Sequence, residues 1–108
     1  MSPLGILNTS IVTADGVYSL ITISSEEARS RALEAESLDS AVGHSSTAKI
    51  LSTMLGVDVP VNIQLFSQKV GQSALVFKLN GRPSPGRELS EEELKRIGFS
   101  FKLLTRLS

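Results

Sequence analysis

Cysteine and tryptophan are absent from this chain of 108 residues, and histidine occurs once, as His44. Without cysteine the chain can form neither a disulfide scaffold nor a thiolate zinc site, and it has no thiol nucleophile. A metal site made of histidines would need ligands from several chains. These absences exclude disulfide-rich and zinc-thiolate classes and leave one imidazole for acid–base chemistry.

An excess of charge of one sign is also missing, because eleven Lys and Arg residues balance eleven Asp and Glu residues. Nonspecific binding to duplex DNA depends on counterion release by excess cations, so we expect no duplex DNA partner. The charge is uneven along the chain, with −3 in residues 1–54 and +3 in residues 55–108. Either this is an ordinary solvated surface, or the C-terminal half supplies cations to one anionic ligand.

Long hydrophobic runs are lacking too. No stretch approaches the roughly 20 apolar residues of a membrane-spanning helix, and residues 1–7 lack the features of a secretory signal. The 41% of apolar residues is typical of a packed globule. We therefore expect a soluble cytoplasmic protein without a membrane partner, folded as a single domain over residues 1–108.

Apolar periodicity predicts five strands and three helices. The strands are expected at residues 4–12, 17–23, 61–66, 74–79 and 99–107, with the first two joined as a hairpin at the Asp15-Gly16 turn. The sequences Ser24-Ser25-Glu26-Glu27 and Ser90-Glu91-Glu92-Glu93 are capping boxes that open the first and third helices. Asp39 can cap the second helix, and Gly56 ends it in the left-handed conformation.

The resulting order, β-β-α-α-β-β-α-β, predicts an α+β (mixed α/β) domain with a mixed, mostly antiparallel sheet flanked by helices. Strict βαβ alternation is missing, so a doubly wound nucleotide-binding fold is not expected. The sequence contains no Walker loop, no GxGxxG, no GxSxG and no HExxH motif.

His44 follows Gly43, which permits close approach by another group, and precedes the three hydroxyl residues 45–47. If a helical turn begins near Ser45, free amides and hydroxyls face an anion there, and the histidine beside them can act as a general acid. The alternative is a surface or capping histidine, and the residues alone leave both open.

Two further positions are candidates for ligand contact. The polar residues Asn8, Thr9 and Ser10 interrupt an apolar strand, either because one strand face is wet or because a ligand lies there. Arg82 opens a loop constrained by prolines, and arginine suits bidentate phosphate binding. The alternative for Arg82 is a solvated turn residue.

Five stretches of the chain resemble one family. Residues 6–10 are similar to its first strand, residues 40–48 and 55–62 to its signature S-A-(I/V)-G-H-x-x-T-A…L-G-V-x-V-P-x-N, and residues 77–82 and 97–99 to its C-terminal half. The family is that of the small viral ring nucleases that act as type III anti-CRISPR proteins, with relatives in archaeal viruses, phages, mobile elements and some CRISPR loci. The resemblance covers nearly the whole chain.

The resemblance implies a homodimer that binds cyclic tetra-adenylate, the second messenger of type III CRISPR complexes, across its two-fold axis. Family members cut this ring into linear di-adenylates without a metal or cofactor, which silences the signal. A 2′-hydroxyl of the ligand attacks the adjacent phosphorus, and the family histidine protonates the 5′-oxygen that leaves. By this resemblance His44 is the general acid.

The same resemblance assigns ligand contacts. Asn8, Ser45, Thr47 and Arg82 match positions at or near the ligand. Neighbouring or signature positions counted with them are Thr9, Gly43 and Asn62. A symmetric tetra-anion can bind a chain of zero net charge because the cations need only be local.

The chain departs from the family in its loop. The family usually has R-x-x-E-G there, with a catalytic glutamate, but Pro85 stands at the glutamate position after Arg82. Glu88 lies three residues further on and is the candidate replacement.

A second departure removes a cation. The family usually has arginine after the asparagine of V-P-x-N, whereas Ile63 follows Asn62 here. Lys78 or Arg87 is the candidate to replace it. Two functions therefore stay open: a ring nuclease, that is, a cyclic oligoadenylate phosphodiesterase with an altered site, and a protein that binds the cyclic oligonucleotide without cutting it.

Overall fold

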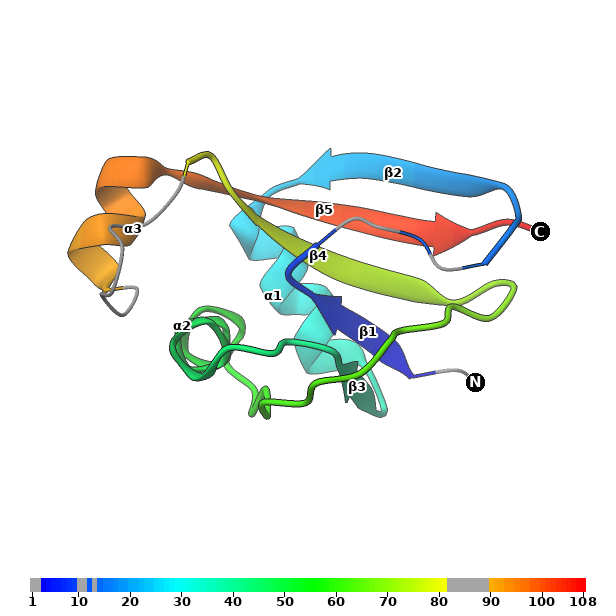
Figure 1. Ribbon diagram of the computed structural model, residues 1–108, viewed down its shortest axis with the longest axis horizontal. Coiled ribbons are helices and arrows are strands. Elements are labelled where there is room, and N and C mark those ends of the chain that lie inside the picture. The colour runs from blue at the N-terminus through cyan, green and yellow to red at the C-terminus, as the bar shows by residue number, and fades with distance from the viewer. Residues whose placement is uncertain (1–2, 10–11, 13, 82–89) are drawn as a thin grey trace.

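Five strands form one mixed sheet in the order β2-β5-β4-β1-β3 (Figure 1). The computed structural model describes residues 3–9, 12, 14–81 and 90–108. Its strands are β1 (Leu4–Leu7), β2 (Tyr18–Ile23), β3 (Leu38–Ser40), β4 (Ser73–Leu79) and β5 (Phe99–Arg106). β1 pairs in parallel with β3 and β4, whereas β5 pairs antiparallel with β4 and β2. The predicted α+β class with a mixed sheet flanked by helices is confirmed.

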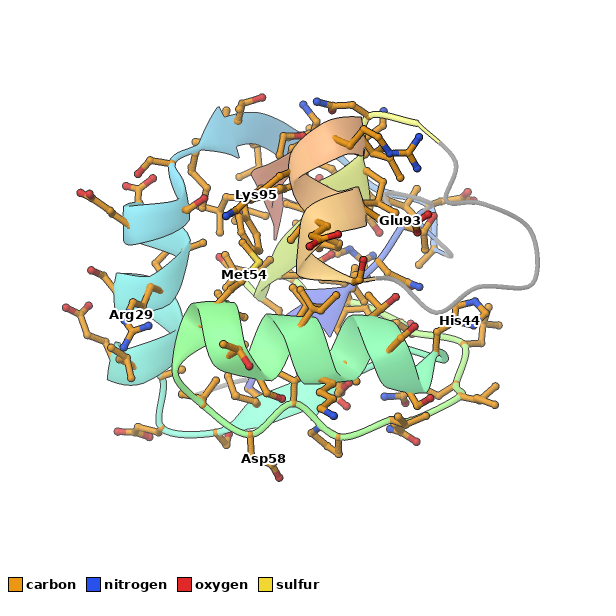
Figure 2. The ribbon with its side chains drawn as sticks, turned by 90° about the vertical axis from the view of Figure 1, so that its left-hand side faces the viewer. Arg29, His44, Met54, Asp58, Glu93 and Lys95 are labelled. Carbon is orange, nitrogen blue, oxygen red and sulfur yellow. The ribbon has the colours of Figure 1, made fainter. Side chains whose placement is uncertain are left out.

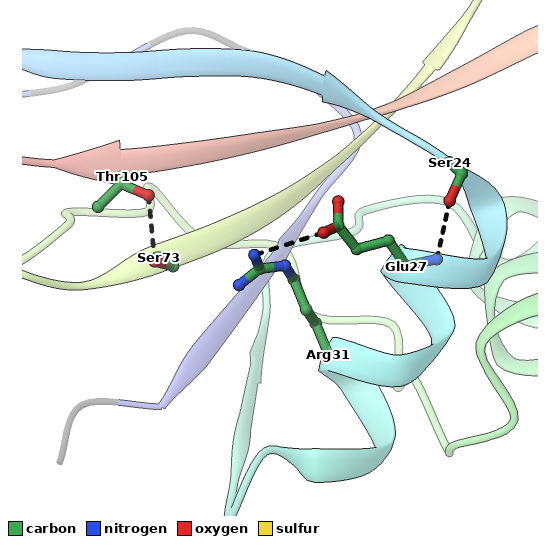
Figure 3. A network of polar contacts seen from close by, with 5 residues as sticks. All are labelled: Ser24, Glu27, Arg31, Ser73 and Thr105. Carbon is green, nitrogen blue, oxygen red and sulfur yellow. Dashed lines mark hydrogen bonds and ion pairs between the residues drawn. The ribbon is translucent and has the colours of Figure 1, made fainter.

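The three helices are α1 (Ser25–Glu34), α2 (Ser45–Leu55) and α3 (Glu91–Ile97), and Figure 2 shows them from the end of the molecule. The side chain of Ser24 accepts a hydrogen bond from the Glu27 amide at 3.0 Å (Figure 3). Gly56 ends α2 with φ 72° and ψ 21°, the left-handed conformation that favours glycine. The predicted cap at Ser24 and the predicted helix end at Gly56 are both confirmed. In the described ranges, no helix combines the length and apolar character needed to cross a membrane.

The predicted hairpin between the first two strands is wrong, because β2 pairs with β5 and not with β1. β1 is a central strand whose Ile6 and Leu7 are buried, whereas β2 exposes Leu20 and Ile21. A strand buried on both faces needs neighbours on both sides, and β3 and β4 fill those places. The Asp15-Gly16 turn therefore leads to the far edge of the sheet.

Two further elements differ in place from the prediction. Residues 61–66 do not belong to a strand, and the fifth strand is the three-residue β3. Asp39, the predicted cap of the second helix, lies within β3, and His44 is the N-cap residue of α2. Side-chain amides of residues 62 and 64, and not a backbone ladder, bind this segment to the end of β3.

The sheet buries its two faces differently. One face, called here the first face, packs Ile6, Leu75 and Phe101 against all three helices in a single cluster. The opposite, second face carries a smaller cluster of Leu7, Ala74, Val76 and Leu104, against which Tyr18, Ala41 and Phe66 pack. In Figure 1 the second face is toward the viewer and α1 lies behind the sheet.

Candidate functional site

The parallel half of the sheet gathers polar residues at one edge. Because β1, β3 and β4 run in parallel, their carboxyl ends lie at the same edge, where ligands bind in related sheets. Asn8 and Thr9 follow β1, residues 41–44 follow β3, and Asn80 follows β4. Figure 1 shows β1 and β4 running toward the end of the molecule that carries α2 and α3.

His44 stands at the N-cap of α2 in an extended conformation, with φ −121° and ψ 128°. Its carbonyl accepts a hydrogen bond from the Ala48 amide at 3.0 Å, but its side chain makes no capping hydrogen bond. The residue is exposed. The imidazole can therefore exchange a proton with a bound molecule.

The first turn of α2 differs from the first turns of the other two helices. Ser24 caps α1 and Ser90 caps α3, each with its side-chain oxygen, whereas no side chain caps α2. The first turn of α1 contains Glu26 and Glu27, but that of α2 contains no acid. Unpaired amides and the helix dipole therefore place a partial positive charge beside His44, as anion sites require.

α2 carries His44 to the side of the sheet opposite α1. At the C-terminal end of α2, Arg29 of α1 donates a hydrogen bond to the Met54 carbonyl at 3.3 Å. Figure 2 shows Arg29 and His44 at opposite ends of α2. Since α1 covers the first face, His44 lies toward the second face. Lys78 is exposed near the end of β4 and, by alternation with the buried Phe77, also belongs to the second face.

The chain before His44 is held by a network centred on Ser40, which is 4% exposed. The Ser40 hydroxyl donates to the Pro60 carbonyl at 2.7 Å and accepts from the Val42 amide at 3.3 Å. The Ser40 carbonyl accepts from the side chains of Asn62 at 2.8 Å and Gln64 at 2.7 Å. The approach to His44 is thus fixed by hydrogen bonds on both sides.

The predicted ligand contacts are distributed as follows. Asn8 is half-buried and Thr9 exposed after β1, while Ser45 is exposed and Thr47 half-buried in the first turn of α2. Gly43 is half-buried directly before His44. Asn62 uses its amide nitrogen on Ser40, so this donor already has a structural role.

Ile63, the residue at the departure from the family pattern, lies beside Gly43. A side-chain carbon added at Gly43 would be 3.5 Å from Ile63 Cγ1. The Ile63 side chain is 85% exposed. The edge of the site therefore presents an apolar group where the resembled family has a cation.

Five positions of the sequence analysis lie outside the described residues. They are Ser10, Arg82, Pro85, Arg87 and Glu88. Their expected roles remain predictions. In the part of the chain that the structure describes, no three His, Asp or Glu residues come together as a metal-binding group.

Glu93 is a candidate that the sequence assigned only to a helix cap. Its amide donates to the Ser90 side chain at 3.2 Å, but its carboxylate pairs with Arg96 at 3.2 Å. The other carboxylate oxygen, Oε2, is buried and has no hydrogen-bond partner among the described residues. Figure 2 shows Glu93 on the same side of the molecule as His44. No sequence signal separates this acid from Glu92 except its third position in the helix.

Known proteins are similar to this chain in sequence. The model of the STIV B116-like family matches residues 4–101. YddF of Bacillus subtilis (strain 168) is 30% identical over 105 residues, covering 96% of this chain and 97% of that protein. ORF117 of Acidianus two-tailed virus is 34% identical over 109 residues, covering 96% and 93%.

A solved structure agrees with the fold. B116 of Sulfolobus turreted icosahedral virus has a TM-score of 0.77 at 21% identity, covering 97% of this chain and 100% of that one. Because the identity is low, this likeness concerns the fold alone. The family match and the relatives along nearly the full length lead to one conclusion: the chain belongs to the STIV B116-like family, whose members include proteins of archaeal viruses.

Proposed function

We propose that this protein is a metal-independent ring nuclease that binds cyclic tetra-adenylate and cleaves it to linear di-adenylates. The observation that carries the proposal is the exposed His44 at the N-cap of a helix that no side chain caps. A proton donor and a set of free amides then face the same anion. The resemblance of residues 40–48 to the signature of viral ring nucleases supports the choice of ligand.

The chemistry needs little from the protein beyond position and charge. The 2′-oxygen of the ligand forms a bond to phosphorus while the bond from phosphorus to the 5′-oxygen breaks. His44 gives a proton to the departing 5′-oxygen, and the product keeps a 2′,3′-cyclic phosphate. A carboxylate accepts the 2′-hydroxyl proton, and we assign this role to Glu93, whose buried Oε2 has no hydrogen-bond partner among the described residues. The step requires this oxygen to become accessible when the ligand binds. Placing the reacting atoms in line supplies much of the rate.

The symmetry of the ligand suits two copies of the site. Two di-adenylates arise when two opposite linkages of the ring are cut, and two copies of His44 facing one ring can make both cuts without releasing it. A homodimer with the ligand on its two-fold axis meets this need. Its Lys78 residues and helix N-termini gather positive charge locally, although the net charge of the chain is zero. The protein would act in the cytoplasm, where it would switch off type III CRISPR signalling.

Incubation of the protein with labelled cyclic tetra-adenylate in EDTA tests the proposal. We expect linear di-adenylates with wild-type protein and a rate lower by about 10²–10⁴ with His44→Ala, the usual contribution of a general acid. If stoichiometric wild-type protein forms no more linear product than His44→Ala, the protein is not a ring nuclease.

A second function follows from the apolar group at the site. Ile63 is exposed beside Gly43, in place of a cation, and Pro85 stands at the catalytic position of the family. A protein with these changes would bind the cyclic oligonucleotide as a sponge or sensor without cutting it. Calorimetry would then give tight binding, with the ring recovered intact. Absence of binding would reject both functions.

A further inference from the structure

The two edges of the sheet are protected to different degrees. At one edge, β3 has only three residues, carries the charged Asp39, and binds the side chains of Asn62 and Gln64. At the other edge, β2 has six residues, and within the described chain no strand or helix lies beyond it (Figure 1). Sheet edges are usually protected by charge, proline, a bulge or a short length. β3 has such protection, and β2 does not.

The sequence of β2 and its flanks is uncharged and largely apolar. Residues 16–25 contain no charged side chain and no proline. Leu20 lies opposite Leu104 on the second face of the sheet and is 47% exposed. Ile21 lies opposite Leu103 on the first face and is 50% exposed. Exposed apolar side chains on both faces of an open edge favour contact with another strand.

Alternate residues of β2 direct their backbone groups away from the sheet. Just before β2, the Val17 amide donates to the Ser108 carbonyl at 3.1 Å, and the Val17 carbonyl accepts from the Leu107 amide at 2.7 Å. Along an antiparallel strand, residues that bond to the neighbour alternate with residues that do not. Within the described chain, the backbone amides and carbonyls that point outward without a partner are therefore those of Tyr18, Leu20 and Thr22.

A second copy of β2 fits this edge when it runs antiparallel about a two-fold axis at Leu20. In this register Leu20 opposes Leu20 of the second copy, and Tyr18 opposes Thr22. Every outward amide then meets an outward carbonyl. An axis one residue further, at Ile21, would place Tyr18 opposite Ser24, whose carbonyl already accepts a hydrogen bond within α1. The backbone therefore favours the axis at Leu20.

The side chains match in the same register. On the second face, the apolar pair at Leu20 lies between two pairs of an aromatic with a β-branched residue, a combination that stabilises neighbouring strands. On the first face, Val17 opposes Ile23, and Ile21 opposes Ser19. Like charges that oppose each other are destabilising, but β2 has no charge to oppose. A peptide or nucleic acid recognised by its charge would find no counter-charge in this strand.

We infer that the outer edge of β2 is a contact between two copies of this chain, in which their sheets join antiparallel at Leu20 into one continuous sheet. β2 and β3 are the opposite edges of the sheet, and His44 follows β3. The contact is therefore separate from the site at His44. It adds to the homodimer of the proposed function and does not depend on that function.

Sedimentation equilibrium tests the contact with a charge at its axis. We expect Leu20→Lys to raise the dissociation constant about a hundredfold or more, because two ammonium groups would meet there, and to have at most about half the mass of the wild type. Leu33→Lys is the matched control, because Leu33 is 54% exposed near the end of α1 that leads to β3. Equal masses of wild type and Leu20→Lys at all concentrations would overturn the inference, as would an equal loss of mass in Leu33→Lys.

Leu20→Pro tests the same contact through the backbone. Because the Leu20 amide points outward, proline there removes a donor of the contact and no hydrogen bond of the sheet. We expect the mass to fall as in Leu20→Lys, while a native circular dichroism spectrum shows that the variant folds. A folded Leu20→Pro that keeps the mass of the wild type would show that the two strands do not pair.

Single cysteines test the register, since the chain has none of its own. Opposed residues in a hydrogen-bonded antiparallel pair have α-carbons about 5.5 Å apart, within the range of a disulfide, whereas diagonal residues are about 7–8 Å apart. Leu20→Cys lies at the axis, but the two copies of Ile21→Cys are diagonal. Under mild oxidation, Leu20→Cys should form a covalent dimer at least about ten times faster than Ile21→Cys. Equal rates, or a faster reaction of Ile21→Cys, would contradict the axis at Leu20.

Discussion

At the scale of residues, the candidate site combines an imidazole without a capping hydrogen bond and a carboxylate that is satisfied at only one of its two oxygens. His44 caps a helix with its backbone and leaves its imidazole unused, and Glu93 buries an oxygen that nothing in the described chain satisfies. A buried oxygen without a hydrogen bond is destabilising. The exposed His44 imidazole can meet a ligand directly, whereas the Glu93 carboxylate, buried and paired with Arg96, must first become accessible.

Glu93→Gln keeps the shape of the side chain and removes its ability to take a proton. We expect cleavage of cyclic tetra-adenylate to slow by about 10²–10⁴, while binding of the uncut ring in a His44→Ala background changes little. Single-turnover assays on Glu93→Gln give the rate, with Glu92→Gln as the control because Glu92 is an exposed neighbour on the same helix. Equal rates for the two variants would assign Glu93 to the fold of α3 alone.

The sequence predicts some of these residues and not others, for a physical reason. His44 stands out because no other imidazole competes with it. Glu93 does not stand out in the sequence, because the pattern of a capping box does not tell which group the glutamate bonds to. Its carboxylate can bond back to the helix terminus or, as here, pair with Arg96. Tertiary packing decides which group a side chain bonds to. It also explains why the Asn62 side chain donates its hydrogen bond to the Ser40 carbonyl.

At the scale of elements, α2 positions the candidate site, and its N-terminus is less well stabilised than those of α1 and α3. α1 and α3 begin with serine caps, and α1 adds two acids, whereas α2 begins with neither. Packing compensates for the missing cap, since Ala48, Leu51 and Leu55 of α2 are buried in the main core. A helix held by its apolar face can leave its N-terminus open to an anion.

Ser45→Asp tests this relation by placing an acid in the first turn of α2. We expect the free energy of unfolding to rise by about 0.3–1 kcal/mol and the affinity for cyclic tetra-adenylate to fall, because the carboxylate competes with phosphate for the same amides. Urea unfolding and calorimetry measure the two effects. Thr53→Asp adds the same charge near the other end of α2 and should leave the affinity unchanged. Higher affinity in Ser45→Asp would contradict an anion site.

Local elements are predictable where their signals are local. The caps at Ser24 and Ser90 and the left-handed Gly56 depend on neighbours within four residues, and the sequence shows them directly. β3 has three residues, too few for an alternating pattern, and its place depends on pairing with β1. The segment at residues 61–66 has the pattern of a strand but bonds mainly through side chains.

Ser40→Ala tests how firmly this segment is attached. The substitution leaves the Pro60 carbonyl and the Val42 amide without their shared hydroxyl, so we expect the protein to lose about 1–3 kcal/mol of unfolding free energy. Ser52 makes a similar bond to the Val59 amide at 2.8 Å, and Ser52→Ala offers a comparison on the other side of the segment. If Ser40→Ala melts like the wild type, the network does not hold the approach to His44.

At the scale of the molecule, the antiparallel and parallel halves of the sheet have different roles. The antiparallel pairs of β5 with β2 and β4 build much of the core, where Phe77, Phe99 and Phe101 pack in tilted and edge-to-face contacts with ring centroids 5.5–6.0 Å apart. The parallel pairs of β1 with β3 and β4 create the edge at which His44 lies. Lys78 at the end of β4 belongs to the basic half of the chain, so local charge can differ from a net charge of zero.

The stoichiometry of ligand binding is a property of the proposed homodimer and not of any single residue. Calorimetric titration of His44→Ala, which retains the uncut ring, should give one cyclic tetra-adenylate for every two chains. At a ligand concentration of 100 times the dissociation constant, binding adds about 2.7 kcal/mol, and the melting temperature should rise by several degrees. Linear tetra-adenylate, which lacks the ring symmetry, serves as the control and should produce a smaller shift. One ring per chain would mean that each copy of the site acts alone, because a ligand on the two-fold axis must be shared by both His44 residues.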